Sequence, residues 1–219
     1  MIITAQSPCR VDLAGGTLDI WPLYLYHENA VTVNFAVDRY TSCELRTRKD
    51  KKIILRSSDQ KGEESFDSLE SLSNASKYKL PLLAYIVPFF QPDMGIELST
   101  NSEAPAGAGI SGSSSLLITI SSALNKLMRT GYNIEQIREI SQNVEAQIIR
   151  VPTGCQDYYP AMYGGVSAVE MNPAGIHRRE IPLDLNEFNS RIVLAYTGKP
   201  RDSGINNWEV TKLHINGHK

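Results

Sequence analysis

Cysteine and histidine are scarce in this chain, and their scarcity narrows the kinds of site it can carry. The 219 residues include only three cysteines (Cys9, Cys43 and Cys155) and four histidines. The cysteines are odd in number and lack the spacing of metal motifs, which disfavours a disulfide scaffold and indicates a reducing, cytoplasmic setting. The histidines are scattered, so the sequence predicts no zinc site.

Long apolar runs and clusters of like charge are also missing. No stretch has the length of a membrane span, and the first residues show no secretion signal. The net charge is -2 and Lys and Arg are spread along the chain, so we expect neither a membrane nor a nucleic-acid partner. A composition of 42% hydrophobic and 21% charged residues is typical of a globular protein. The oligomeric state is not predicted by any of these features.

The order of strand-like and helix-like segments predicts an α+β layered fold. Strands are expected at 2–6, 10–14, 30–37, 42–48, 52–57, 95–100, 166–171, 176–181 and 191–196, and helices at 80–90, 113–129, 134–149 and from about 203. Polar residues 62–74 are expected to form a loop. Asn133 and Gln136 form a capping box at the start of one helix, and Gly131 is placed to end the helix before it.

The most informative stretch is residues 105–115, Pro-Ala-Gly-Ala-Gly-Ile-Ser-Gly-Ser-Ser-Ser, which leads directly into an apolar helical segment. Glycine lets the backbone approach a ligand, and the first amides of the next helix lack internal partners. Together with the helix dipole, these features favour a bound phosphate. The stretch matches neither the P-loop nor the dinucleotide fingerprint. The alternative is a serine-rich N-cap with glycines in a surface turn.

Charged side chains near the N-terminus are candidates for a site. Arg10 and Asp12 are expected on one face of a strand, with Val11 and Leu13 facing the core. Arg10 is well placed to meet an anion, or it forms a surface ion pair with Asp12. Asp19 follows a glycine pair and is a second candidate, or it is the N-cap of the short apolar stretch after it.

Two later carboxylates are candidates for phosphoryl-transfer chemistry. Glu145 lies near the end of its helix, where the dipole disfavours a carboxylate and a divalent cation would reverse that penalty. Its alternatives are a solvated side chain or a loose pair with Arg150. Asp157 is placed to take a hydroxyl proton, or it caps a short helix.

Three blocks in order resemble the GHMP kinase superfamily, named for galactokinase, homoserine kinase, mevalonate kinase and phosphomevalonate kinase. Residues 8–19 have the spacing of the opening block of its sugar kinases, and residues 105–115 are similar to its phosphate loop. Glu145 with residues 154–157 resembles its carboxylate pair. The Gly-Gly-Thr-Leu-Asp and Gln-Asp-Tyr segments most resemble the branch of the heptose 7-phosphate and fucose kinases. The three blocks together are highly specific.

The resemblance implies a fold and an activity. The expected fold is the family's N-terminal ATP-binding domain, with ribosomal-protein-like α/β layers, over residues 1–185. Residues 186–219 would begin a C-terminal domain that is largely missing. The implied activity is transfer of the γ-phosphate of ATP, with Mg²⁺, to a hydroxyl of a sugar or sugar phosphate.

The resemblance also assigns a role to each candidate. Asp157 would orient or deprotonate the acceptor hydroxyl, and Arg10 would stabilise charge between it and the γ-phosphate. The residues implied to bind ATP are Pro105, Gly107, Ala108, Gly109, Ile110, Ser111, Gly112, Ser113, Ser114 and Ser115. Those implied to hold Mg²⁺ are Glu145 with Ser113 or Ser114. Those implied to bind substrate are Gly16, Thr17 and Asp19.

Two departures from the family pattern leave alternatives open. The loop is one residue longer than the usual form, which leaves the metal-binding serine undecided. Beyond Gly198 only Gly204 and Gly217 remain to supply the family's third glycine-rich motif. One alternative is therefore a truncated or degenerate relative that binds nucleotide without turnover. Another is a mevalonate-pathway kinase or decarboxylase of the same superfamily; Arg10 and Asp19 in the sugar-kinase pattern argue against the decarboxylase.

Overall fold

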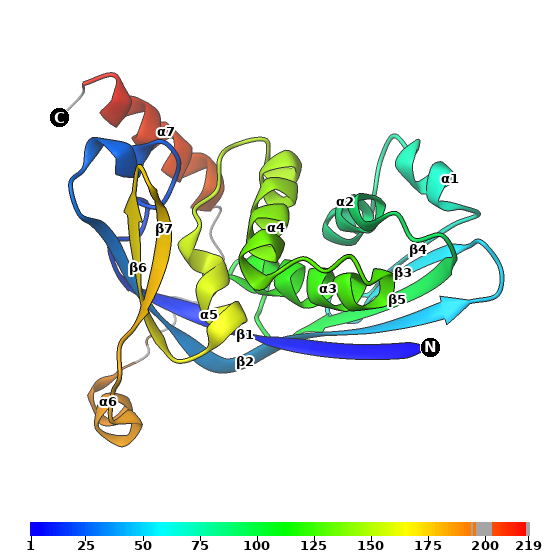
Figure 1. Cartoon of the computed structure of the whole chain (residues 1–219), viewed down its shortest axis with the longest axis horizontal. Coiled ribbons are helices and arrows are strands. Elements are labelled where there is room, and N and C mark those ends of the chain that lie inside the picture. Colours follow the sequence, from blue (N-terminus) through cyan, green and yellow to red (C-terminus); the bar gives the residue numbers. More distant parts are fainter. Residues whose placement is uncertain (194, 196–202, 218–219) are drawn as a thin grey trace.

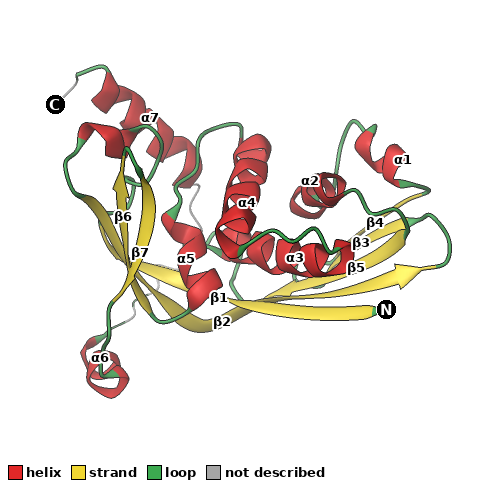
Figure 2. Ribbon diagram, in the orientation of Figure 1, coloured by secondary structure: helices red, strands yellow, loops and turns green. Residues whose placement is uncertain are grey.

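A mixed β-sheet forms the base of the molecule, and α2, α3 and α4 lie together on one side of it (Figure 1; Figure 2). This computed structural model describes residues 1–193, 195 and 203–217. The strands are β1 (Ile2–Ala14), β2 (Ala30–Arg48), β3 (Ile53–Ser57), β4 (Gly62–Phe66), β5 (Gly95–Ser102), β6 (Val166–Asn172) and β7 (Gly175–Glu180). The α-helices are α1 (Leu69–Ser73), α2 (Pro81–Phe90), α3 (Gly112–Met128), α4 (Ile134–Ile149), α5 (Tyr159–Tyr163), α6 (Leu185–Arg191) and α7 (Ser203–Ile215). Two short 3-10 helices are η1 (Leu23–Tyr26) and η2 (Gln156–Tyr158).

The long strand β2 connects the two halves of the sheet. The strand order is β4-β3-β5-β2-β6-β7, and β1 pairs with β2 outside this path. Residues 41–48 of β2 pair with β5, and residues 30–35 pair with β6. All of these pairings are antiparallel except β3 with β5. The α+β prediction is therefore confirmed. The strands expected separately at 2–6 and 10–14 form one continuous strand, β1, and those expected at 30–37 and 42–48 form one continuous strand, β2.

The helix α3 is buried against the sheet along most of its length. The main core cluster joins Leu45 and Leu98 of the sheet to Leu117 and Leu124 of α3. Val144 of α4 also belongs to this cluster. Because burial of apolar surface is the dominant favourable term in folding, this packing fixes the direction of α3 and the position of its first turn.

Helix ends follow the sequence signals only in part. Asn133 and Gln136 form the predicted capping box of α4. By contrast, α3 ends at Met128, and Arg129 takes the left-handed conformation (φ 53°) expected two residues later, at Gly131. The prediction that Gly131 ends the helix was therefore wrong, although Gly131 also has a positive φ (74°): the Arg129 amide already bonds to the Asn125 carbonyl and closes the last turn.

Three further expectations are corrected. Residues 62–74 form β4 and α1, and Ser68 caps α1 through a reciprocal bond with Ser71. Arg191 is the last residue of α6, so no strand begins there; positions 194 and 196 lie outside the described residues. Leu13 does not face the core, because its side chain is 49% exposed near the end of β1. The expected helix from about residue 203 is confirmed as α7.

Within the described part of the chain, no helix combines the length and the apolar character that a membrane span requires.

We predict that Leu117→Ala destabilises the protein by about 2–5 kcal/mol, because it removes a fully buried side chain and leaves a cavity. Leu185→Ala, at a position 61% exposed on α6, is the matched control and should stay within about 0.5 kcal/mol of wild type. Urea unfolding monitored by circular dichroism measures both values. Equal effects would contradict the assigned core.

Candidate functional site

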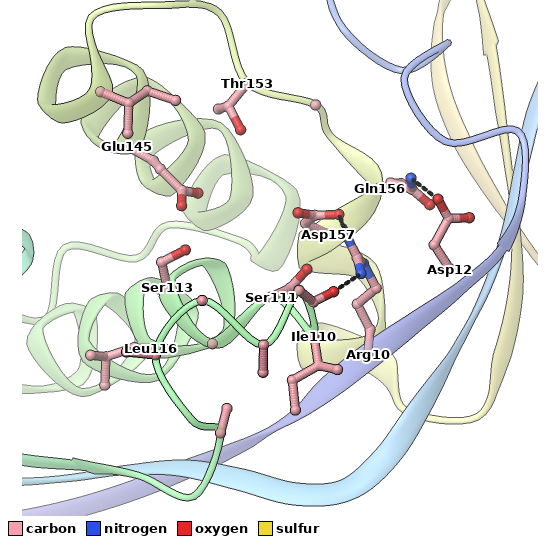
Figure 3. Close-up of a pocket in the computed structure, with 18 of the residues that line it drawn as sticks. Arg10, Asp12, Ile110, Ser111, Ser113, Leu116, Glu145, Thr153, Gln156 and Asp157 are labelled. Atoms are coloured by element: carbon pink, nitrogen blue, oxygen red, sulfur yellow. Dashed lines mark hydrogen bonds and ion pairs between the residues drawn. The ribbon is translucent and has the colours of Figure 1, made fainter. Parts of the chain in front are cut away.

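A cavity of about 650 Å³ opens beside the N-terminus of α3 (Figure 3). Its walls come from β1 and the turn after it, the loop before α3, the C-terminal half of α4, and the segment between α4 and α5. All predicted site residues line this cavity except Ser114 and Ser115. Segments separated by more than a hundred residues therefore meet where the sequence predicted a single site.

The loop before α3 presents a series of backbone amides to the cavity. Gly107 and Gly109 have φ values of 71° and 76°, in the left-handed region that favours glycine. The first helical bond runs from the Ser115 amide to the Ser111 carbonyl, 3.0 Å away. The amides of Ser111 to Ser114 therefore have no intrahelical acceptor and lie at the positive end of the helix dipole. This is the geometry that favours a bound phosphate.

The serines of this loop differ in their surroundings. Ser111 occupies the N-cap position, but its side chain makes no capping bond and its Oγ is buried without a partner. Ser115 points the other way: its Oγ donates to the Ser7 carbonyl at 3.1 Å and lies 2.8 Å from Thr41 Oγ1. The expectation that amides as far as Ser115 face a phosphate is corrected, because its amide is already bonded within α3.

Arg10 ties three parts of the site together. Its Nε donates to Asp157 Oδ1 at 2.9 Å, and its Nη2 donates to the same oxygen. Its Nη1 donates to the Gly109 carbonyl at 3.0 Å (Figure 3). Its backbone amide donates to the Ile110 carbonyl at 3.1 Å. The alternative of an Arg10–Asp12 ion pair is therefore wrong. Burial lowers the pKa of Arg10, but the charge and hydrogen bond of Asp157 outweigh it, so the pKa lies above its ordinary value.

Asp157 lies inside η2 and does not cap it, because Cys155 occupies the N-cap position. Its Oδ1 receives both bonds from Arg10. The side chain remains 26% exposed at the cavity. Asp157 is thus held by one oxygen and retains a second carboxylate oxygen that neither Arg10 bond uses.

Asp19 is buried at the edge of the same cavity. Its Oδ2 accepts a hydrogen bond from the Gln156 amide at 2.9 Å, and it does not cap η1, whose N-cap is Pro22. A Cβ atom at Gly154 would lie 2.0 Å from Asp19 Oδ2, so only glycine fits beneath this carboxylate. Burial, followed by the charge of Asp157, raises the pKa of Asp19 to about 7.

Gln156 and Asn34 support the site and were not identified from the sequence. Gln156 Nε2 donates to Asp12 Oδ2 at 3.1 Å, and Asn34 Nδ2 donates to the Gln156 carbonyl at 3.1 Å. Asn34 is fully buried on β2, so this bond anchors η2 to the middle of the sheet. The available signal was the amide side chain at position 34, in a strand segment whose other residues are apolar or β-branched.

Glu145 is neither solvated nor paired with Arg150. It is only 7% exposed, and its Oε2 accepts bonds from Ser114 Oγ at 2.9 Å and from the Tyr158 hydroxyl. Burial raises the pKa of Glu145, while hydrogen bonds from Ser113 and Tyr158 oppose that rise. The groups available here to coordinate a cation are therefore a carboxylate and hydroxyls, the hard oxygen ligands that suit Mg²⁺.

A cation at Glu145 would need ligands beyond the protein. Among the residues described, no group of three or more His, Cys, Asp or Glu side chains is arranged to hold a metal ion. Mg²⁺ is commonly bound by one or two carboxylates together with substrate phosphates and water. The donor set fits such a shared ion, with the loop amides close by to hold the phosphates.

Comparison with known proteins agrees with this geometry. Residues 79–165 match the family described as GHMP kinases N terminal domain. This region contains the loop before α3, Glu145 and Asp157, whereas Arg10 and Asp19 lie outside it. The match therefore covers the helical side of the cavity.

Individual relatives match a longer part of the chain. A D-glycero-alpha-D-manno-heptose 7-phosphate kinase from Campylobacter jejuni is 29% identical over 211 residues, which are 92% of this chain and 61% of the relative. A putative sugar kinase structure from Campylobacter jejuni superposes with a TM-score of 0.71 at 26% identity, covering 86% of this chain and 58% of that one. The galactokinase of Lactococcus lactis complexed with galactose shares the fold, with a TM-score of 0.69 at 23% identity over 84% of this chain and 48% of that one. The chain thus spans about half to three fifths of these proteins.

The raised pKa of Asp19 predicts a specific pH dependence of stability. Between its ordinary pKa of 3.8 and about 7, the folded state binds a proton that the unfolded state releases, so the contribution of Asp19 to stability is lost as pH rises through this window. We expect the free energy of unfolding of wild type, relative to Asp19→Asn, to fall between about pH 4 and pH 8. Urea unfolding at several pH values measures it. Parallel curves for the two proteins would contradict the assignment.

Proposed function

Because residues 79–165 match the N-terminal domain family of the GHMP kinases, we propose that this chain transfers the γ-phosphate of ATP to a hydroxyl of a sugar or sugar phosphate, with Mg²⁺ as cofactor. Residues 1–185 are proposed as the ATP-binding domain and residues 186–219 as the start of a second domain. Among the described residues after β7, those of α6 are all at least partly exposed, which supports a boundary there.

The observation that carries the proposal is the convergence of four groups on one cavity. The loop amides, Glu145 and the Arg10–Asp157 pair all line it, and Asp19 lies beside the pair. A phosphoryl transfer needs an anion seat, a metal carboxylate, a proton acceptor and a positive charge near the transferred group. Each of these is supplied by a different segment of the chain.

Each group has a role that follows from its contacts. The amides of Ser111 to Ser114 would bind the phosphates, and Asp19 would accept a hydrogen bond from the sugar. The Asp157 oxygen that Arg10 leaves unused would take the acceptor proton as the hydroxyl oxygen bonds to the γ-phosphorus. The bond from that phosphorus to the bridging oxygen breaks, and ADP leaves. Arg10 would offset the negative charge on the transferred group.

Glu145 is the proposed metal ligand. Glu145, with the hydroxyl of Ser113 or Ser114, would hold Mg²⁺ beside the phosphates. When bound, the ion neutralises part of the charge on the phosphate oxygens. It would also offset the burial cost of the Glu145 carboxylate, whose pKa is raised without it.

A second candidate function is nucleotide binding without turnover. The chain spans 61% of the heptose 7-phosphate kinase that it matches, which keeps this candidate open. Incubation with ATP, Mg²⁺ and a panel of sugars and sugar phosphates, with ADP release as the readout, separates the two. ADP release that depends on one acceptor supports the kinase, whereas tight nucleotide binding without acceptor-dependent release supports the second candidate.

We predict that Asp157→Asn lowers acceptor-dependent turnover by at least about a hundredfold, because the amide cannot accept the proton. Nucleotide affinity should stay close to that of wild type, since the phosphates are proposed to bind the loop amides and not Asp157. ADP release and calorimetric titration with ATP measure the two quantities. Retained turnover would exclude Asp157 as the proton acceptor.

We also predict that Glu145→Gln weakens binding of Mg²⁺-ATP by roughly tenfold, because even outer partners of a metal ligand contribute that much. Binding of ATP in the presence of EDTA should change little. Calorimetry under both conditions provides the comparison. An equal loss under both conditions would count against a metal role for Glu145.

A further inference from the structure

Two adjacent tyrosines in the segment after α4 send their hydroxyls to different carboxylates. Tyr158 and Tyr159 are both fully buried. The Tyr158 hydroxyl donates to Glu145 Oε2, near the C-terminal end of α4. The Tyr159 hydroxyl donates to Glu135 Oε2 at 3.2 Å, in the first turn of the same helix. Only the first of these two bonds reaches the cavity, because Glu145 lines it and Glu135 does not.

The Tyr158 bond restricts the orientation of Glu145. Ser114 Oγ donates to the same oxygen, Oε2, so two donors from different segments hold one side of the carboxylate. Neither bond uses Oε1. In Figure 3 the Glu145 side chain extends from α4 toward Ser113 at the start of α3. A carboxylate held through one oxygen presents the other in a defined direction, as a metal ligand requires.

The same tyrosine is covalently joined to the proposed proton acceptor. Tyr158 and Asp157 are consecutive residues of η2, and the Gln156 carbonyl of this turn is bonded to Asn34 in the sheet. Asp157 is fixed on its other side by Arg10. The Tyr158 side chain therefore connects Glu145 to the turn that carries Asp157. Because this turn is bonded to the sheet through Asn34, it sets the distance between Glu145 and Asp157.

We propose that Tyr158 is a positioning residue whose hydroxyl orients Glu145 for the Mg²⁺ of a bound nucleotide and sets that ion relative to Asp157. The inference rests on the proposed function, since it assumes that Glu145 is a metal ligand. Its physical basis is that a buried carboxylate deprived of a donor loses a charge-assisted hydrogen bond and the orientation which that bond imposes.

The two tyrosines provide a matched pair of variants. Tyr158→Phe and Tyr159→Phe each delete one buried hydroxyl and keep the ring, so their packing losses should be similar. Affinity for a non-hydrolysable ATP analogue is measured by calorimetry on the full chain, once with Mg²⁺ and once with EDTA. Thermal unfolding of each variant confirms that it folds.

We expect Tyr158→Phe to weaken binding of the Mg²⁺ complex by about tenfold and to leave binding in EDTA unchanged. Tyr159→Phe should change neither affinity. Wild-type affinity in Tyr158→Phe, or an equal loss with and without Mg²⁺, would overturn the positioning role while leaving the proposed function intact. If Mg²⁺ has no effect on nucleotide binding by the wild-type chain, the metal site itself is refuted, and the role of Tyr158 with it.

Discussion

The contact between Arg10 and Asp157 is the interaction on which the site depends. It joins residues 147 positions apart, and the same guanidinium also holds the Gly109 carbonyl. The pair is partly buried, so its charges are screened less than those of a surface ion pair. Loss of either partner would leave the other charge unpaired inside the cavity. Loss of the Arg10 side chain would also remove its bond to the Gly109 carbonyl, while the backbone bond from Arg10 to Ile110 would remain. A single side chain on the first strand thus connects the loop to the turn that carries the carboxylate.

Excess negative charge is the second constraint on this cavity. Its acidic lining residues are Asp12, Asp19, Asp59, Glu145 and Asp157, and within the described residues Arg10 is its one basic side chain. Burial raises the pKa of both Asp19 and Glu145, and the charge of Asp157 adds to each rise. A hydroxyl donor at Asp19 and a divalent cation at Glu145 would each relieve part of this cost. The electrostatics of the protein alone therefore favour a hydroxyl donor and a divalent cation, two of the ligands that the proposed reaction requires.

Local signals predicted the helices well where a single segment determines the outcome. The capping box at Asn133, the burial of α3 and the glycine loop before it all follow from short-range patterns. The prediction failed at residues 62–74, where a polar strand is held at the sheet edge by pairing with β3. It also failed at Leu13, which lies at an irregularity in the pairing of β1 with β2, between Asp12 and Ala14, where the alternation of the strand is interrupted.

The sequence by itself determined which residue types are present for phosphate, metal and proton chemistry, because glycines, serines and carboxylates at fixed spacing have the same local properties in any fold. Only the tertiary structure decided which of them act together. It turned Ser115 into the core, paired Arg10 with Asp157 instead of Asp12, and placed Tyr158 against Glu145. These contacts arise from the packing of α3 on the sheet and of α4 against α3. Such packing depends on the whole apolar surface, and no short segment encodes it.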